Sequence, residues 1–271
     1  MSLILSVLAS SSSANCIWVA SDTTAILVDA GMSLRRLEER LAVLGQDVER
    51  LQGVCLSHEH SDHISGVPAL CRRRGIPVYA NSGTIEGARR SWKDFKPAWR
   101  VFETGRPFAI GDLSIEPFAV PHDAYDPVGF VISAGGARVG IATDMGMPTT
   151  LIRERLRGCH GLVVESNHDE RMLRDSERPW ALKQRILGRQ GHLSNRRAAE
   201  MVAEIAGPGL SCVVLAHVSS ECNDPGVAIG EMRASLAARG REDVKIAVAA
   251  DDTPIVWRFQ AETTREPVVA G

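Results

Sequence analysis

The stretch His58-Glu59-His60-Ser61-Asp62-His63 holds three of the eight histidines of the chain within six positions. It directly follows an apolar run, so we expect it to begin where a buried strand reaches the edge of a sheet. If strand geometry continues, the side chains of His58 and His60 point to the same side and can bind one cation. After a turn, Asp62 and His63 offer ligands for a second cation. Imidazole and carboxylate ligands without a thiolate favour Zn²⁺ or Mn²⁺, with Fe²⁺ as a further option.

Three other residues of the same chemical kind follow predicted strands. His122, Asp144 and His217 come directly after, or close behind, the apolar runs 115–120, 138–143 and 212–216. Any one of them alone is most simply a turn residue at a strand end. Together they repeat one pattern, and a single sheet edge can bring them to the histidine run. The sequence therefore predicts a site for two divalent metal ions.

The composition is that of a globular protein of 271 residues, with 31 Lys+Arg, 33 Asp+Glu and a net charge of −2. We predict one domain over residues 1–259 and a flexible tail over 260–271. No apolar run approaches the ~20 residues that a bilayer span requires, so we expect no membrane association. The balanced charge excludes a protein that coats nucleic acid with a uniformly basic surface. Six cysteines without a C-x-x-C pair, and an N-terminus without a basic segment, indicate a reduced cytoplasmic protein.

The order of predicted elements indicates two sheets with helices outside them. Ser33 and Ser194 are expected to cap two of the helices, and Asp224 followed by Pro225 is a typical helix start. The spacing predicts strands at 3–8, 17–20, 25–29, 53–57, 77–80, 162–165, 212–216, 244–248 and 255–259, antiparallel strands across 101–143, and helices at 34–44, 82–90, 178–187 and 195–205.

The histidine run with His122, Asp144 and His217 resembles the metallo-β-lactamase fold superfamily over nearly the whole chain. The segments 165–169, 191–195 and 215–217 resemble the WalJ/YycJ-type branch, which is related to tRNA 3′-processing endonucleases and phosphonate-pathway cyclic phosphodiesterases. The resemblance implies an α/β fold, a four-layer αββα sandwich with the metal ions at its mouth. It also implies that one ion is bound by His58, His60 and His122 and the other by Asp62, His63 and His217, with Asp144 as the bridge.

Two metal ions would lower the pKa of a bridging water and hold the attacking and leaving oxygens of a phosphoester. Asp62 could also orient the resulting hydroxide. We predict that His192 donates the proton to the leaving group. The resemblance to the tRNA-processing enzymes implies that Glu165 orients this histidine. His168, Asn167 and Asn195 are candidate substrate contacts, although His168 could equally be an ordinary loop histidine.

The distribution of charge favours nucleic acid as the substrate. Residues 71–106 carry nine basic and three acidic side chains, and residues 168–197 carry eight and four. Trp92, Phe95 and Trp99 lie among cations, which is typical of a base-stacking surface or of an ordinary helix with core aromatics. We expect a metal-dependent phosphodiesterase or nuclease, such as a DNA exonuclease. The alternatives are a small-molecule cyclic phosphodiesterase, a thioesterase-type metallohydrolase and a non-catalytic metal-binding protein; the oligomeric state stays open.

Overall fold

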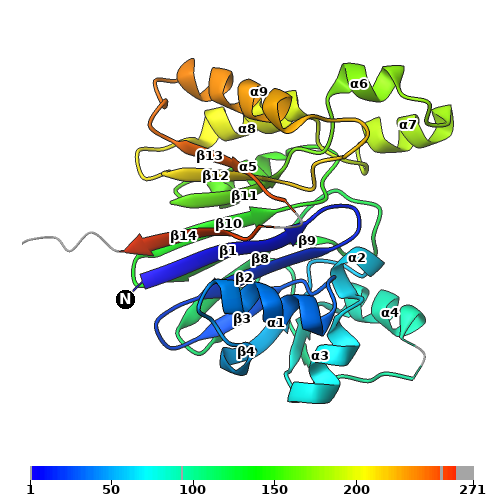
Figure 1. Ribbon diagram of the computed structural model, residues 1–271, viewed down its shortest axis with the longest axis vertical. Helices are drawn as coiled ribbons and strands as arrows, with labels where there is room; N and C mark the ends of the chain where they lie inside the picture. Colours follow the sequence, from blue (N-terminus) through cyan, green and yellow to red (C-terminus); the bar gives the residue numbers. More distant parts are fainter. Residues whose placement is uncertain (1, 93, 251–252, 261–271) are drawn as a thin grey trace, which may run out of the picture.

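The computed structural model describes residues 2–92, 94–250 and 253–260 (Figure 1). Two seven-stranded sheets lie face to face, and helices cover the outer face of each sheet. The predicted four-layer αββα sandwich is therefore confirmed. No helix in these ranges is long and apolar enough to cross a membrane.

The first sheet has the strand order β14-β1-β2-β3-β4-β5-β6. From β14 through β1 and β2 to β3, each strand is antiparallel to the next, whereas β3 to β6 run parallel. The bounds are β1 (Ser2–Ser10), β2 (Asn15–Ala20), β3 (Ala25–Val28), β4 (Leu51–Cys55), β5 (Val78–Ala80), β6 (Trp99–Val101) and β14 (Ile255–Gln260).

The second sheet has the order β13-β12-β11-β10-β9-β8-β7 and repeats this division. Its strands β7 to β10 are antiparallel, and β10 to β13 are parallel. The bounds are β7 (Phe108–Ile110), β8 (Leu113–Ala119), β9 (Val128–Ala134), β10 (Ala137–Ala142), β11 (Gly161–Glu165), β12 (Cys212–Ala216) and β13 (Lys245–Val248).

The helices divide between the two outer faces and one end of the sandwich (Figure 1). The first sheet is covered by α1 (Leu34–Val43), α3 (Val67–Arg74) and α4 (Ser82–Ser91), and the second by α5 (Thr150–Leu156), α8 (Asn195–Ile205) and α9 (Pro225–Ala237). The short helices α2 (Ser61–Ile64), α6 (Glu170–Asp175) and α7 (Trp180–Leu187) lie at the right-hand end in the view of Figure 1. A 3₁₀ turn, η1 (Val48–Arg50), precedes β4.

The strand β1 shows why the sheets pack in layers. Successive side chains of a strand point to opposite faces of its sheet. Leu3 and Leu5 belong to the core between the two sheets, together with Phe130 of β9. Ile4 and Leu8 belong instead to the core under the helices of the first sheet. Both faces of β1 are therefore apolar, and the strand is buried between layers.

Most of the predicted elements are present, and several differ from the prediction. Ser33, Ser194 and Asp224 cap their helices as predicted, and all six cysteines are buried and free. The predicted helix 178–187 is shorter, because Pro179 stands at its start, and the helices α2, α5 and α6 were not predicted. Strand β6 pairs with β5 and so belongs to the first sheet, not to the antiparallel run. Strand β14 reaches residue 260, while residues 261–271, where we predicted a tail, lie outside the described ranges.

The topology brings the ends of six strands to one edge of the sandwich. Strands β3 and β4 run parallel in the first sheet, and β8, β10, β11 and β12 share one direction in the second. Parallel strands end on the same side of a sheet, where α/β proteins place their binding sites. A residue of the candidate site, or a residue that contacts one, stands at or just after the end of each of the six strands. In chain order these residues are Asp29, His58, His122, Asp144, Glu165 and His217.

The loop after β3 packs so closely on the start of α2 that one glycine there has no room for a side chain. A Cβ on Gly31 would overlap the backbone carbonyl of Asp62. We expect Gly31→Ala to lower the free energy of unfolding by about 1–3 kcal/mol, because the backbone must move apart. Urea unfolding measures this change. The matched control is Gly230→Ala in α9, where a Cβ meets open space; equal midpoints for the two variants would contradict the close approach.

Candidate active site

Three residues at the edge of the sandwich have a left-handed backbone that non-glycine residues rarely adopt. Asp29, Asp144 and His217 have φ values of 60°, 53° and 53°. They are the only non-glycine residues with positive φ among those that the structure describes. Such conformations persist only where the surroundings enforce them, and they concentrate at functional sites. All three follow strand ends at this edge, and two of them, Asp144 and His217, are predicted metal ligands.

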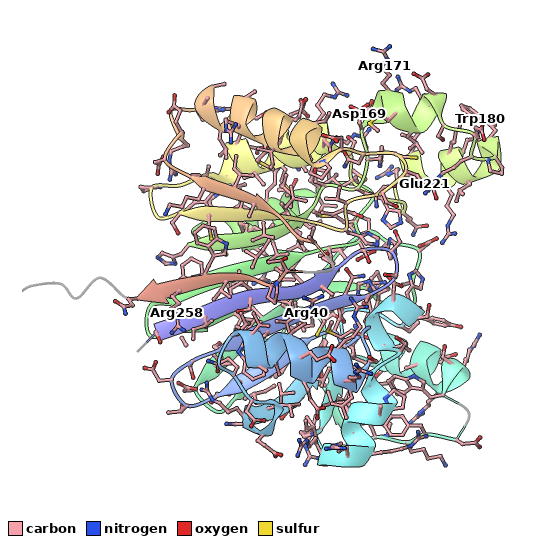
Figure 2. All side chains as sticks on the ribbon, in the orientation of Figure 1. Arg40, Asp169, Arg171, Trp180, Glu221 and Arg258 are labelled. Carbon is pink, nitrogen blue, oxygen red and sulfur yellow. The ribbon has the colours of Figure 1, made fainter. Side chains whose placement is uncertain are left out.

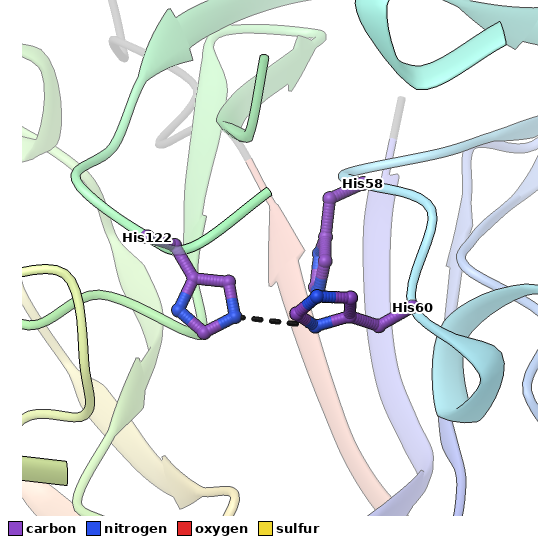
Figure 3. Close-up of side chains that lie close together, drawn as sticks. All are labelled: His58, His60 and His122. Atoms are coloured by element: carbon purple, nitrogen blue, oxygen red, sulfur yellow. Dashed lines mark hydrogen bonds between the residues drawn. The ribbon is translucent and has the colours of Figure 1, made fainter. Parts of the chain in front are cut away.

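The first cluster consists of His58, His60 and His122, whose nearest ring nitrogens all lie within 4.8 Å of one another (Figure 3). His122 Nε2 lies 3.3 Å from His60 Nδ1. Strand β4 ends at Cys55, so His58 and His60 lie in an extended loop and not on a continued strand as we had considered. They still reach the same side, and their ring centroids are 4.6 Å apart.

The second cluster is built around the carboxylate of Asp144. Its Oδ2 lies 3.2 Å from His63 Nε2, and its Oδ1 lies 3.3 Å from His217 Nδ1 and 4.0 Å from His122 Nε2. Asp62 Oδ2 lies 3.3 Å from His63 Nε2 and 3.9 Å from His217 Nε2. Asp144 therefore touches both clusters. This is the position that the resemblance implies for a bridging ligand.

The donor atoms fit divalent metal ions. His58 Nε2 and His217 Nε2 are buried and have no hydrogen-bond partner among the described residues. Buried polar atoms are normally paired, so these two nitrogens call for a ligand. Burial holds the pKa of His58 well below its usual value, which leaves a neutral ring with a free lone pair. Clusters of imidazole and carboxylate groups of this kind support divalent-metal binding by the chain.

Two residues that sequence reasoning missed hold the ligands in place. Asp29 Oδ2 accepts hydrogen bonds from His63 Nδ1 at 2.8 Å and from Ser57 Oγ at 2.7 Å. This leaves His63 Nε2 facing Asp62 and Asp144. Asn15 Nδ2 donates to Asp62 Oδ2 at 2.9 Å. The signal for Asp29 was present, because it follows strand β3 as the other acidic and histidine residues follow theirs.

Glu165 is completely buried and forms four hydrogen bonds. Its Oε1 accepts from His192 Nδ1 at 2.6 Å and from His217 Nδ1 at 3.0 Å. Its Oε2 accepts the backbone N–H groups of Met145 and Leu193 at 2.8 and 3.0 Å. The contact between Glu165 and His192 that the resemblance implies is therefore present in the structure.

This pairing changes the protonation of both partners. Burial opposes ionisation of Glu165, but the adjacent imidazole of His192 outweighs it and lowers the pKa of Glu165 to about 2. Burial also opposes the charged form of His192, yet Glu165 raises the pKa of His192 to about 9. Near neutral pH, Glu165 is thus ionised and the imidazole of His192 carries a proton on both ring nitrogens.

The three candidate substrate contacts differ in what surrounds them. Both side-chain atoms of Asn195 bond within the protein, since Oδ1 accepts from Ser166 Oγ at 2.6 Å and Nδ2 donates to Asn223 Oδ1 at 2.7 Å. Asn167 Nδ2 donates to the backbone carbonyl of His217 at 2.9 Å. These amides support the loops of the site, and their contact with substrate stays a prediction. His168 is buried with both ring nitrogens unpaired among the described residues.

The aromatic residues near the basic segment belong to the core. The rings of Trp92 and Trp99 stack with centroids 5.8 Å apart, and Phe95 meets Trp92 edge to face at 5.3 Å. All three pack against the apolar cluster under the first sheet. Of the two interpretations considered from the sequence, packing of the aromatics against the core fits this arrangement. The expected helix is wrong, because α4 ends at Ser91 and Trp99 begins strand β6.

Residues 24–218 match the family described as beta-lactamase superfamily domain. Two relatives are similar over most of their length. The chain is 34% identical to exodeoxyribonuclease YycJ of Bacillus anthracis over 82% of this chain and 85% of that protein. It is 35% identical to exodeoxyribonuclease WalJ of Streptococcus pneumoniae, over 80% of this chain and 82% of that one.

A solved structure has the same fold. The metallo-beta-lactamase fold protein YhfI from Bacillus subtilis superposes with a TM-score of 0.73 at 16% identity, covering 96% of this chain and all of that one. The match to the family, over residues 24–218, includes strands of both sheets. The chain belongs to the β-lactamase superfamily, in the branch that contains the exodeoxyribonucleases YycJ and WalJ.

Proposed function

We propose that this protein is a phosphodiesterase dependent on two divalent metal ions, and that it degrades DNA from an end. The observation that carries the proposal is the hydrogen bond of 2.6 Å between Glu165 and His192, which supports a role for His192 as an oriented proton donor beside the candidate metal ligands. The names of the relatives YycJ and WalJ support an exodeoxyribonuclease activity. Free, buried cysteines fit action in the reducing cytoplasm.

Seven side chains are proposed to hold the ions. His58, His60 and His122 would bind one ion, Asp62, His63 and His217 the other, and Asp144 would contact both. The nitrogen and oxygen ligands favour Zn²⁺ or Mn²⁺, with Fe²⁺ as a further option. When bound, such a pair of ions supplies an activated water and neutralises charge on the phosphate.

The remaining chemistry belongs to the side chains. His192 Nδ1 donates to Glu165, which fixes the ring so that Nε2 faces away from the glutamate. A proton held on Nε2 can pass to the leaving oxygen, because this histidine is half-buried and lines a pocket that a substrate can enter. Asp62 is partly exposed and is proposed to orient the attacking water in addition to binding metal.

Removal of metal tests the first part of the proposal. We expect elemental mass spectrometry to find about two ions per chain, because the proposed mechanism uses two metal ions. A chelator should abolish hydrolysis and lower the melting temperature, because ligands that bind only the folded state add about 2.7 kcal/mol at a hundredfold excess over Kd. Addition of Mn²⁺ or Zn²⁺ should restore both. Full activity in the metal-free protein would contradict the proposal.

His192→Ala tests the proton donor. We expect hydrolysis of DNA to fall by about 10²–10⁴-fold, because the leaving alkoxide then lacks a proton. Bis(p-nitrophenyl) phosphate serves as the internal control, since p-nitrophenolate leaves without protonation and its release should change far less. Metal content should stay that of the parent protein. An equal loss on both substrates would indicate that His192 acts through structure or metal binding instead.

Asp29→Asn tests the positioning of His63. Asparagine keeps the size and tolerates the left-handed backbone, but it is a weaker acceptor for His63 Nδ1–H. We expect the affinity for Zn²⁺ to fall by about 10–100-fold, as for other residues that hold a metal ligand. Competition with a fluorescent chelator measures it. Asp175→Asn, on the exposed side of α6, is the matched control; if the two variants bind zinc equally, Asp29 has no such role.

A further inference from the structure

A second cavity lies beside His192, at the end of the sandwich where α6 and α7 stand. Figure 2 labels Asp169, which caps α6, Arg171 on α6 and Trp180 on α7 in this region. The cavity has a volume of about 180 Å³, and its polar lining consists of His168, Glu170, Arg174, His192, Ser194 and Arg197. The catalytic chemistry proposed above uses only one of these groups, His192.

His168 is the feature that points to a ligand. Its side chain is buried, at 1% exposure, and neither ring nitrogen has a hydrogen-bond partner among the described residues. Its backbone, in contrast, is firmly held, because its carbonyl accepts the N–H of Asn195 at 2.9 Å. An imidazole always carries at least one N–H donor. A buried donor without an acceptor in a native structure calls for a bound group.

The charge of the cavity favours an anion. Glu170 is its one acidic group, and it is occupied by Ser194 Oγ at 3.1 Å, Arg174 at 3.3 Å and Arg196 at 3.5 Å. Arg197 forms no ion pair with an acidic residue in the described ranges. The cavity also borders the N-terminus of α8, an 11-residue helix whose cap is Ser194. Helix N-termini attract anions, so both features add positive potential.

We propose that this cavity binds a phosphate group of the substrate on the leaving-group side of the bond that is broken. The proposal rests on the proposed function, because it takes His192 as the donor to the leaving oxygen. Since His192 lines both this cavity and the neighbouring pocket of about 120 Å³, the leaving nucleotide lies next to the cavity. Phosphate oxygens are acceptors only, and they match guanidinium and imidazole N–H donors.

The consequence is a preference for a terminal phosphate. A dinucleotide with a phosphate on its leaving nucleoside fills both the reaction site and the cavity. The same dinucleotide without that phosphate fills only the first. The terminal phosphate would therefore fix which end of a strand is placed for cleavage.

Three thymidine dinucleotides test this: one without a terminal phosphate, one with a 5′-phosphate and one with a 3′-phosphate. We expect the parent protein to hydrolyse one phosphorylated form with a kcat/KM about tenfold higher than the bare form, the size of one charge-assisted contact. Arg197→Ala should reduce this ratio to about one. The variant should fold, because Arg197 is exposed and alanine favours helix. Arg239→Ala, at an exposed arginine just after the end of α9, should keep the preference.

Absence of any preference in the parent protein, or a preference retained in Arg197→Ala, would overturn the proposal. Bis(p-nitrophenyl) phosphate has no second phosphate, so its unchanged hydrolysis in Arg197→Ala shows that the reaction site is intact. If the parent protein hydrolyses none of these esters, the proposed function fails separately. Calorimetric binding of thymidine 5′- and 3′-monophosphate then decides the cavity: a loss of about tenfold in Arg197→Ala but not in Arg239→Ala supports it, and equal affinities overturn it.

Discussion

The pairing of buried carboxylates with imidazoles is the constraint on which the site depends. His58, His63, His217, Asp144 and Glu165 are all at most 4% exposed. Ionisable groups are buried in a protein only when partners compensate for the lost water. Here each carboxylate faces two or more histidines. Burial raises the pKa of Asp144, but His217 and His63 outweigh it and hold that pKa well below its usual range. The charged form of the carboxylate is thus the stable one.

Glu165 links the two halves of this arrangement, because one oxygen accepts from both His192 and His217. The group that orients the proposed proton donor also orients a proposed metal ligand. Its second oxygen is anchored on backbone N–H groups after β10 and before α8. The donor and the metal cluster therefore cannot shift independently, so the pH response of one depends on the other.

Much of this arrangement could be predicted from the sequence, because strands that end in His or Asp leave a readable pattern. The seven proposed ligands meet at one edge, and Glu165 meets His192. What was missed depends on tertiary contacts. Asp29 looks like any residue at a strand end until His63 is seen against it. Strand β6 was misplaced because its partner, β5, is distant in sequence. Trp92 and Trp99 have the composition of a stacking surface, and only their packing shows that they are core.

The pairing of β1 with β14 has a consequence for how the chain folds. Ser2 lies opposite Gln260, so β1 is synthesised well before β14, the strand that pairs with it at the edge of the sheet. Until then β1 is an edge strand with apolar side chains on both faces, which is the kind of surface that pairs with other chains. Contacts of such sequence separation also slow folding. A nascent chain of this protein therefore needs protection from aggregation until β14 has left the ribosome.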